Sequence, residues 1–239
     1  SPGRFDEYDQ RFLEGIANHV AIVLDNSRRY DATLLDLQRA NEELHLRVQE
    51  LKAVSNFQQR ISDIDAEEDE LENIYTEAAQ AMAGMAINIS NMYIALYDPQ
   101  SAQIHFPLAY EDGRRLTEEE KAASALYSAK PFGEHYSVAE WIMQEWQVNR
   151  QRNALLINQD FKRWIAERGI RTFPTNTKAW LGAPMICNEE LVGMIGLRDA
   201  VQEGVSRESH KELLEIIASQ AAIAITNARL FDASQGQIK

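Results

Sequence analysis

A stretch of 68 residues without glycine or proline, from position 16 to position 83, is the feature that most limits how this chain can fold. Glycine costs about 1 kcal/mol and proline about 3 kcal/mol in a helix interior, so their absence permits very long helices. In contrast, five of the six prolines lie between Pro99 and Pro184. The sequence therefore predicts a helical first third, followed by a part in which helices and strands are mixed.

A pattern of nineteen residues occurs twice in the chain. Residues 12–30 read FLEGIANHVAIVLDNSRRY and residues 213–231 read LLEIIASQAAIAITNARLF, so eight positions are identical at an offset of 201. The identities include an asparagine and an arginine at the polar end, which a shared amphipathic pattern alone does not require. The repeat predicts a module of about two hundred residues that recurs in a longer parent chain.

A heptad pattern follows the first copy of this repeat. Its clearest part is a seam of five residues: Leu37, Asn41, Leu44, Val48 and Leu51. Apolar residues at this spacing are typical of coiled coils, and an asparagine in the seam is the kind of residue that fixes register in a parallel pair. Beyond this seam, which covers about two heptads, the apolar spacing shifts. The pattern indicates a coiled-coil or helix-bundle homodimer, or else a single amphipathic helix packed on its own domain.

Charge and cysteine content exclude several classes of function. The chain has 37 acidic and 24 basic residues, which gives a net charge of −13. A chain this negative repels phosphate backbones, so we expect no nucleic-acid binding. The single cysteine, Cys187, rules out an internal disulfide and a zinc site built from cysteines. The longest apolar runs fall short of the roughly 20 residues that cross a bilayer, so we expect no membrane contact and a cytoplasmic location.

The residues after the long helical part predict an α+β domain with an antiparallel sheet. A helix is expected over residues 71–84 and a second one from Ser206 to about residue 231. The expected strands lie over residues 89–97, 103–110, 154–158, 178–187 and 191–198. A long excursion separates the second strand from the third.

Catalytic motifs are missing from the sequence. It contains no phosphate-binding glycine loop, no HExxH, no CxxC and no nucleophile elbow, so we expect no enzymatic site. The five histidines are scattered, and His210 is expected on the surface of the closing helix. All four tryptophans fall within forty residues, from Trp141 to Trp180. Such a cluster can wall a small-molecule pocket or pin the excursion onto the sheet, and both interpretations stay open.

Three stretches resemble GAF domains. Residues 178–186, KAWLGAPMI, and 191–197, LVGMIGL, look like the paired core strands of that family. Residues 213–230, LLEIIASQAAIAITNARL, look like the helix that closes it. The resemblance implies a GAF/PAS-like central antiparallel sheet with the N- and C-terminal helices packed on one face, preceded by a long linker helix. It also implies a division of the chain into the closing helix of a preceding module (1–30), a linker helix or coiled coil (31–70), a GAF domain (71–233) and the start of the next linker (234–239).

The same resemblance implies a function. Similar modules occur in tandem in bacterial histidine kinases and cyclases, which implies a non-enzymatic sensory module of a multidomain signalling protein, homodimeric through its terminal helices. An unidentified small molecule would bind between the sheet and residues 111–175. The residues expected to line this pocket are His105, Tyr110, Trp141, Asp160, Trp164 and Trp180. A catalytic reductase of the same family and a ligand-free dimerisation spacer are the alternatives.

Three branches of the family can be checked against this sequence. Bilin-binding members attach their chromophore to a pocket cysteine, whereas Cys187 lies in the predicted core hairpin, so a covalent bilin is not expected and no cofactor is assigned. Free-methionine sulfoxide reductases use several cysteines, and a single one cannot form their disulfide. Cyclic-nucleotide-binding members carry an Asn-Lys-Phe/Asp-Glu signature, of which residues 176–178, NTK, lack the Phe and the downstream pair.

Overall fold

The computed structural model describes residues 7–62, 70–84, 87–134, 137–171, 176–204, 206 and 208–236. The chain divides into two compact units, Ser1–Gln49 and Glu50–Lys239. Helix α1 (Glu7–Ser62) makes up the described part of the first unit, and its last turns belong to the second. The helical first third is therefore confirmed. Residues 1–6, 63–69 and 237–239 of the predicted segments lie outside the described residues.

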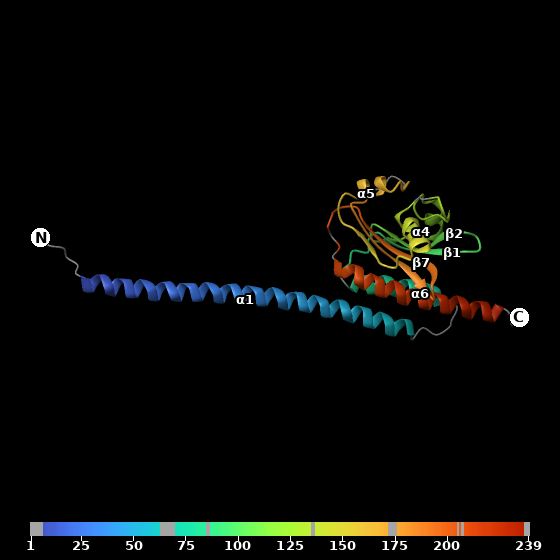
Figure 1. Cartoon of the computed structure of the whole chain (residues 1–239). Helices are drawn as coiled ribbons and strands as arrows, with labels where there is room; N and C mark the ends of the chain where they lie inside the picture. Colours follow the sequence, from blue (N-terminus) through green and yellow to red (C-terminus); the bar gives the residue numbers. More distant parts are fainter. Residues whose placement is uncertain are drawn as a thin grey trace. The chain divides into compact units, whose positions relative to one another are not determined.

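The second unit is an antiparallel sheet with helices on both faces (Figure 1). The sheet order is β3-β2-β1-β7-β6-β5, with β4 beside β2. The strands are β1 (Met92–Asp98), β2 (Gln103–Glu111), β3 (Arg114–Arg115), β4 (Lys130–Pro131), β5 (Leu155–Ile157), β6 (Ala179–Cys187) and β7 (Glu190–Asp199). The helices are α2 (Glu70–Gly84), α3 (Glu118–Ala123), α4 (Val138–Asn149), α5 (Phe161–Glu167) and α6 (Glu208–Gly236). This arrangement confirms the predicted α+β fold, including the long helix that precedes the domain.

The hairpin of β6 and β7 forms the centre of the domain, and local residues explain its turn. Asn188 and Glu189 both have positive φ angles, of 50° and 64°. A two-residue turn with positive φ at both positions has the twist that joins antiparallel strands without splaying them. The hairpin was expected at this place, and the register that it sets pairs Ala179 with Asp199 at the far end of the two strands.

Two apolar cores lie on opposite faces of the sheet. The helix-side core joins α2, α6 and the last turns of α1, through residues such as Phe57 and Ile217, to one face of the sheet. The α4-side core joins α4 and the neighbouring loops to the other face, through residues such as Met143 and Met194. Both faces are therefore covered, as is needed for a sheet whose central strands are apolar on both sides.

Helix α6 contains a long apolar stretch. Over Glu208–Phe231 it is long and apolar enough, by length and composition alone, to cross a bilayer, but half of that stretch is buried inside the domain. Leu214, Ile217 and Ala218 are fully buried in the helix-side core. Packing against the sheet therefore accounts for the apolar character of α6.

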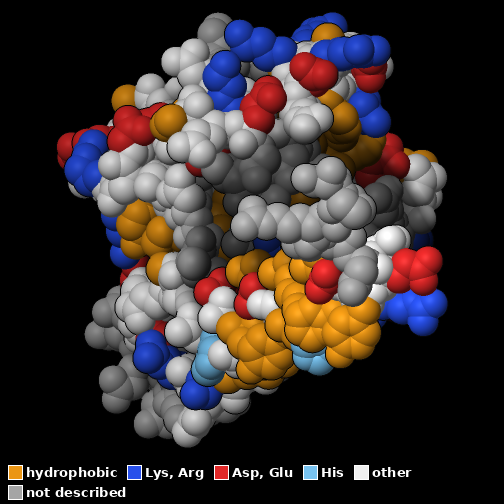
Figure 2. All heavy atoms as spheres, turned by 90° about the vertical axis from the view of Figure 1, so that its left-hand side faces the viewer, with side chains coloured by type: hydrophobic (Ala, Val, Ile, Leu, Met, Phe, Trp, Pro, Cys, Tyr) orange, Lys and Arg blue, Asp and Glu red, His pale blue; other side chains and the backbone are white. Residues whose placement is uncertain are grey.

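Helix α1 differs from α6, because large apolar side chains are exposed in the part of α1 that belongs to the first unit. Phe12, Leu13 and Ile16 are all more than 40% exposed. Figure 2, which looks onto the N-terminal end of α1, shows hydrophobic side chains gathered in a broad patch at the surface. Apolar patches of this kind usually mark a surface that another element covers.

Candidate functional site

The face of the sheet under α4, where the sequence predicts the ligand chamber, is filled by the domain's own aromatic rings. Trp180 on β6 donates a hydrogen bond from Nε1 to the Tyr93 hydroxyl on β1 at 3.3 Å. Glycines make room for both rings: a Cβ at Gly196 would lie 2.4 Å from Tyr93 Cζ, and one at Gly182 would lie 2.2 Å from Trp180 Cη2. The two rings therefore lie directly against the strands and occupy the space above them.

Two further rings complete this group, which we call the aromatic cluster: Tyr93, Phe106, Tyr127 and Trp180. The ring centroids of Tyr93, Phe106 and Tyr127 are 5.8 to 6.0 Å apart in tilted and edge-on pairs, the separation that favours aromatic contacts. Arg198 on β7 donates to the Tyr127 hydroxyl at 2.7 Å. Burial raises the pKa of both tyrosines, most strongly that of Tyr93, so the phenols stay neutral at physiological pH.

A lysine beside this cluster has a lowered pKa. The Lys130 amine lies 5.4 Å from the centre of the Phe106 ring and donates to the Leu126 carbonyl at 2.6 Å. Partial burial lowers the pKa of Lys130 to about 8, against a smaller raising effect of the Glu140 carboxylate. The unfolded chain then binds more protons than the folded one between pH 8 and 10, so stability rises with pH through that window as the cost of burying the charged amine disappears.

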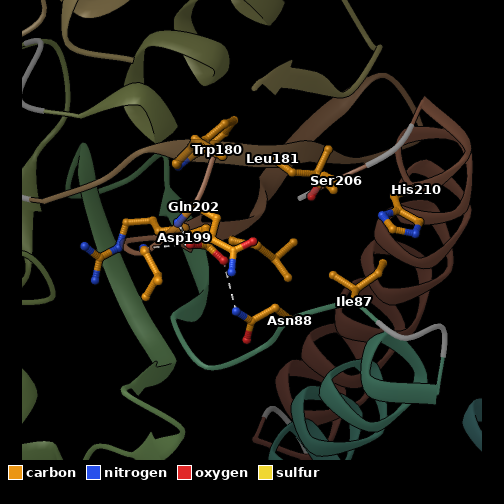
Figure 3. Close-up of a pocket in the computed structure, with 12 residues that line it drawn as sticks. Ile87, Asn88, Trp180, Leu181, Asp199, Gln202, Ser206 and His210 are labelled. Atoms are coloured by element: carbon orange, nitrogen blue, oxygen red, sulfur yellow. Dashed lines mark hydrogen bonds between the residues drawn. The ribbon is translucent and has the colours of Figure 1, made fainter. Parts of the chain in front are cut away.

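A cavity of about 380 Å³ lies elsewhere, at the end of the β6–β7 hairpin remote from its turn (Figure 3). Its size falls in the range of small-molecule pockets. The lining comes from the segment before β1, from both strands, from the segment after β7 and from the start of α6. The lining residues are Ile87, Asn88, Ala179, Trp180, Leu181, Leu197, Arg198, Asp199, Val201, Gln202, Ser206 and His210.

Asp199 organises the polar side of this cavity. Its Oδ1 accepts hydrogen bonds from the backbone N–H groups of Val201 and Gln202 at 2.8 Å, and its Oδ2 accepts one from Asn88 Nδ2 at 3.1 Å (Figure 3). One buried carboxylate thus fixes two loops that are far apart in the sequence. Because these bonds use much of its accepting capacity, Asp199 serves mainly to hold the wall of the cavity.

The remaining wall combines apolar and polar groups. Ile87 and Leu181 belong to the helix-side core and give the cavity an apolar side. His210 reaches it from the first turn of α6, and Gln202 and Ser206 from the segment between β7 and α6 (Figure 3). An apolar wall with a few hydrogen-bonding groups is the usual composition of a site that binds and orients a small organic molecule. Among the described residues, no group of three His, Cys, Asp or Glu side chains could hold a metal ion.

The wall of the cavity also touches the linker helix. His210 Nε2 lies 3.9 Å from Oε1 of Glu50, which is part of α1. Both side chains are buried, at 7% and 2% exposure. The expectation that His210 is a surface residue was wrong, because the apolar spacing of α6 places it on the same stripe as the buried Leu214 and Ile217.

The structure separates the tryptophans that were expected to line one pocket. Trp180 lines the cavity and also belongs to the aromatic cluster. Trp141 and Trp164 form an edge-on pair with centroids 5.2 Å apart, and the Arg168 guanidinium lies 4.0 Å from the Trp164 ring. This pair is half-buried and packs on the α4-side core, and neither member lines the cavity.

The other three predicted ligand residues lie apart from each other. Asp160 is exposed at the start of α5, where its side chain makes no capping hydrogen bond. His105 is exposed and lines a different hollow of about 270 Å³ beside Lys121. Tyr110 packs against the helix-side core, on the opposite face from the aromatic cluster. Of the six, Trp141 and Trp164 form a ring contact, and the backbone N–H of Trp164 donates to the Asp160 carbonyl at 3.0 Å.

Comparison with known proteins shows which family has this fold. The model of the GAF domain family matches residues 65–226. The GAF domain of a phosphoenolpyruvate-protein phosphotransferase from Coxiella burnetii superposes with a TM-score of 0.57 at 11% identity, covering 78% of this chain and 98% of that one. The corresponding Acinetobacter domain gives 0.54 at 15% identity, covering 75% and 94%.

Several similar structures hold small molecules, and two of them serve as examples. The phycocyanobilin-bound GAF domain of a cyanobacterial phytochrome gives a TM-score of 0.52 at 15% identity, covering 76% of this chain and 96% of that one. The free methionine-R-sulfoxide reductase of Neisseria meningitidis, in complex with its substrate, gives 0.52 at 11% identity, covering 76% and 90%. No curated protein sequence matches this chain. At these identities the likeness to solved structures establishes the fold.

Proposed function

Because this chain belongs to the GAF domain family, we propose that it is a non-enzymatic sensory module whose ligand occupies the cavity at the end of β6 and β7. The observation that carries the proposal is the position of His210. It lines the cavity and meets a carboxylate of α1, Glu50, across 3.9 Å. A ligand in the cavity therefore contacts a residue on which the packing of the linker helix depends.

The coupling rests on the burial of Glu50. A carboxylate with 2% exposure has lost its hydration and depends on the groups that surround it, so a displacement of His210 changes its free energy. Phe57, 1% exposed, anchors the same end of α1 in the helix-side core. A ligand that prefers one position of His210 shifts the balance between two arrangements of α1 by its difference in affinity for them. Couplings of about 1–3 kcal/mol are typical of such systems.

The expected output is a homodimer of α1. The seam residues Leu37, Leu44, Val48 and Leu51 are between 41% and 70% exposed, and Asn41 lies among them. Parallel packing of two such seams would give the signal a path along the helix, into the kinase, cyclase or other output of a multidomain bacterial signalling protein. The proposed setting is the cytoplasm.

The dimer can be tested by one substitution and a matched control. Leu44→Lys places a charge in the seam and is expected to weaken dimerisation at least tenfold. Leu35→Lys makes the same chemical change at an exposed position outside the seam, and the chain should remain dimeric. Light scattering across a concentration series measures both. A dimer that survives Leu44→Lys would contradict the seam.

Ligand binding is tested by thermal shift and native mass spectrometry against nucleotides, tetrapyrroles, amino acids and metabolite extracts. A ligand of the cavity should raise the melting temperature of the wild-type chain and of Ser128→Phe, which obstructs the separate 270 Å³ hollow. It should not raise that of Ser206→Phe, which obstructs the 380 Å³ cavity. The absence of any ligand would favour the dimerisation spacer, and binding unaffected by Ser206→Phe would place the site elsewhere.

The coupling from the cavity to α1 through His210 and Glu50, which we call the relay, is measured with the ligand found in that screen. Hydrogen exchange over residues 50–62 should change when the ligand binds to the wild-type chain. Glu50→Gln removes the charge of the carboxylate but keeps its shape, so this variant should still bind the ligand while its exchange no longer responds. An unchanged response in Glu50→Gln would refute the relay and leave the binding site intact.

The position of Cys187 argues against the reductase alternative. It lies at the end of β6 next to the hairpin turn, whereas the cavity is at the other end of this nine-residue strand. At about 3.3 Å per residue, Cys187 lies roughly 20 Å from Leu181, the lining residue of β6 nearest to it. Cys187→Ser should therefore leave both ligand binding and the relay unchanged.

A further inference from the structure

The sheet-facing side of α6 provides a template for interpreting the first turns of α1. Helix α6 packs on β5, β6, β7 and α2, and the residues of this contact are 0–8% exposed. They are Leu213, Leu214, Ile217, Ala218, Ala221, Ala222, Ala224, Ile225 and Ala228.

The internal repeat carries the same stripe into α1. At the offset of 201, these positions correspond to Phe12, Leu13, Ile16, Ala17, Val20, Ala21, Val23, Leu24 and Ser27. Eight of the nine are apolar, as in the stripe that α6 buries. However, the six large side chains among them are 46–62% exposed. The described residues thus include a second apolar stripe like that of α6, and no described residue covers it.

The width of the stripe indicates what covers it. In the heptad frame of the seam at residues 37–51, Leu13, Ile16, Val20 and Val23 continue the two seam positions. Residues 12–24 are also apolar beside the seam, at Phe12, Ala17, Ala21 and Leu24. One partner helix in a coiled coil covers only a narrow seam, whereas a sheet covers several adjacent rows, as it does on α6.

The flanking positions change character farther along the helix. Around the seam at residues 37–51 they are mostly polar, for example Gln38, Glu42, Glu43 and Arg47. The change from a wide stripe to a narrow seam therefore occurs within one continuous helix, between residues 28 and 37. This pattern separates a segment suited to a sheet from a segment suited to a second helix.

We propose that residues 12–28 form a docking surface for the sheet of another GAF-type unit, joined ahead of this helix in the same polypeptide. Helix α1 would close that sheet as α6 closes the sheet described here. The size of the side chains refines the partner. Phe12, Val20 and Val23 stand where α6 has Leu213, Ala221 and Ala224, so the facing residues of the other sheet must be smaller at these points.

A helix exchange within the chain tests this proposal. In the first chimera residues 213–229 are replaced by the sequence of residues 12–28. A size-matched chimera makes the same replacement but keeps Leu213, Ala221 and Ala224, so that it adds no bulk to a packed core. The control chimera inserts residues 33–49 from the same helix, which would place Asn41 and Glu42 at the fully buried positions of Ala221 and Ala222.

The expected outcomes separate the wide apolar stripe of residues 12–28 from the narrow seam farther along the same helix. The size-matched chimera should unfold cooperatively, within roughly 10 °C of the wild-type melting temperature, and the first chimera at a lower temperature because of its extra bulk. The control chimera should show no cooperative transition. Loss of cooperative unfolding in the size-matched chimera, or folding of the control to the same extent, would overturn the proposal.

Oligomeric state supplies an independent measurement on the intact chain. Leu24 lies outside the heptad seam, so Leu24→Lys should leave the association of this chain unchanged if a sheet is the partner of the wide stripe. A shift to monomers in Leu24→Lys would show that a second copy covers the stripe, and this too would overturn the proposal. Neither measurement depends on the ligand or on the relay through His210.

Discussion

Gly193→Ala is expected to cost about 4 kcal/mol of folding free energy, a large share of the roughly 5–15 kcal/mol that stabilises a domain. Gly193 lies on β7, where a Cβ would approach the Ala95 carbonyl oxygen to 2.1 Å and the Leu96 Cα to 2.9 Å. Both are backbone atoms of the neighbouring strand, so no side-chain rotation relieves the overlap. The two central strands must move apart, which breaks the ladder that holds the aromatic cluster on one face and the helix-side core on the other.

Urea unfolding followed by circular dichroism measures this loss, and Gly15→Ala serves as its control. Gly15 lies within exposed α1 with no atom within 4 Å of the added Cβ. The same substitution should therefore be neutral or stabilise α1 by up to about 1 kcal/mol, because alanine is the better helix former. A cost below 1 kcal/mol for Gly193→Ala would show that β1 and β7 do not approach as closely as described.

Local patterns made much of the fold predictable. The absence of breakers predicted α1, and the alternating apolar residues with their turn predicted the β6–β7 hairpin. In both cases the deciding interactions lie within a few residues of each other. The covering of both faces of the sheet also followed from β1, in which the residues on either side are apolar and buried from Met92 to Leu96.

Face assignments on β2 show why a candidate site is harder to predict. Strict alternation would put Phe106, Leu108 and Tyr110 on one face, yet Phe106 belongs to the α4-side core and the other two pack on the helix side. The pairing of β1 with β2 shifts register between Ile94 and Leu96, which adds one residue to β2. An inserted residue exchanges the faces of everything beyond it. Pro107 lies within that shift, but a proline inside a strand is typical of an edge strand as well as of a bulge, so the sequence alone does not reveal the exchange of faces.

The cavity could not be located from the sequence for a related reason. Its polar wall depends on Asp199 binding Asn88 across 111 positions of sequence, together with two backbone groups of the following loop. No short motif encodes such an arrangement. His210 and Glu50 are separated still farther along the chain. The apolar spacing of α6 could have identified His210 as buried, but its partner on α1 could be recognised only from the fold.

Trp180→Ala is expected to cost about 4 kcal/mol, because truncating a buried tryptophan removes its packing and leaves a void. Trp180 is 2% exposed and lies against Gly182 while it donates to Tyr93. Because the void would be shaped for an indole ring, we expect millimolar indole to restore part of the lost melting temperature, as a ligand that binds only the folded state must. Chemical unfolding and thermal shift measure the two effects.

Trp141→Ala is the matched control, since Trp141 is half-buried at the surface of the α4-side core and its removal leaves a site open to water. It should cost less, and indole should not rescue it. Comparing Trp180→Ala with Trp141→Ala decides whether the aromatic cluster is a filled core or the wall of a ligand chamber. A filled core loses stability when Trp180 is truncated and regains it with indole. A chamber that normally admits a ligand beside Trp180 would instead tolerate the truncation, at a cost below about 1 kcal/mol, and its ligand would still bind to Ser206→Phe, in which the cavity at the end of the hairpin is obstructed. That second result would move the sensory site from the end of the β6–β7 hairpin to the face under α4.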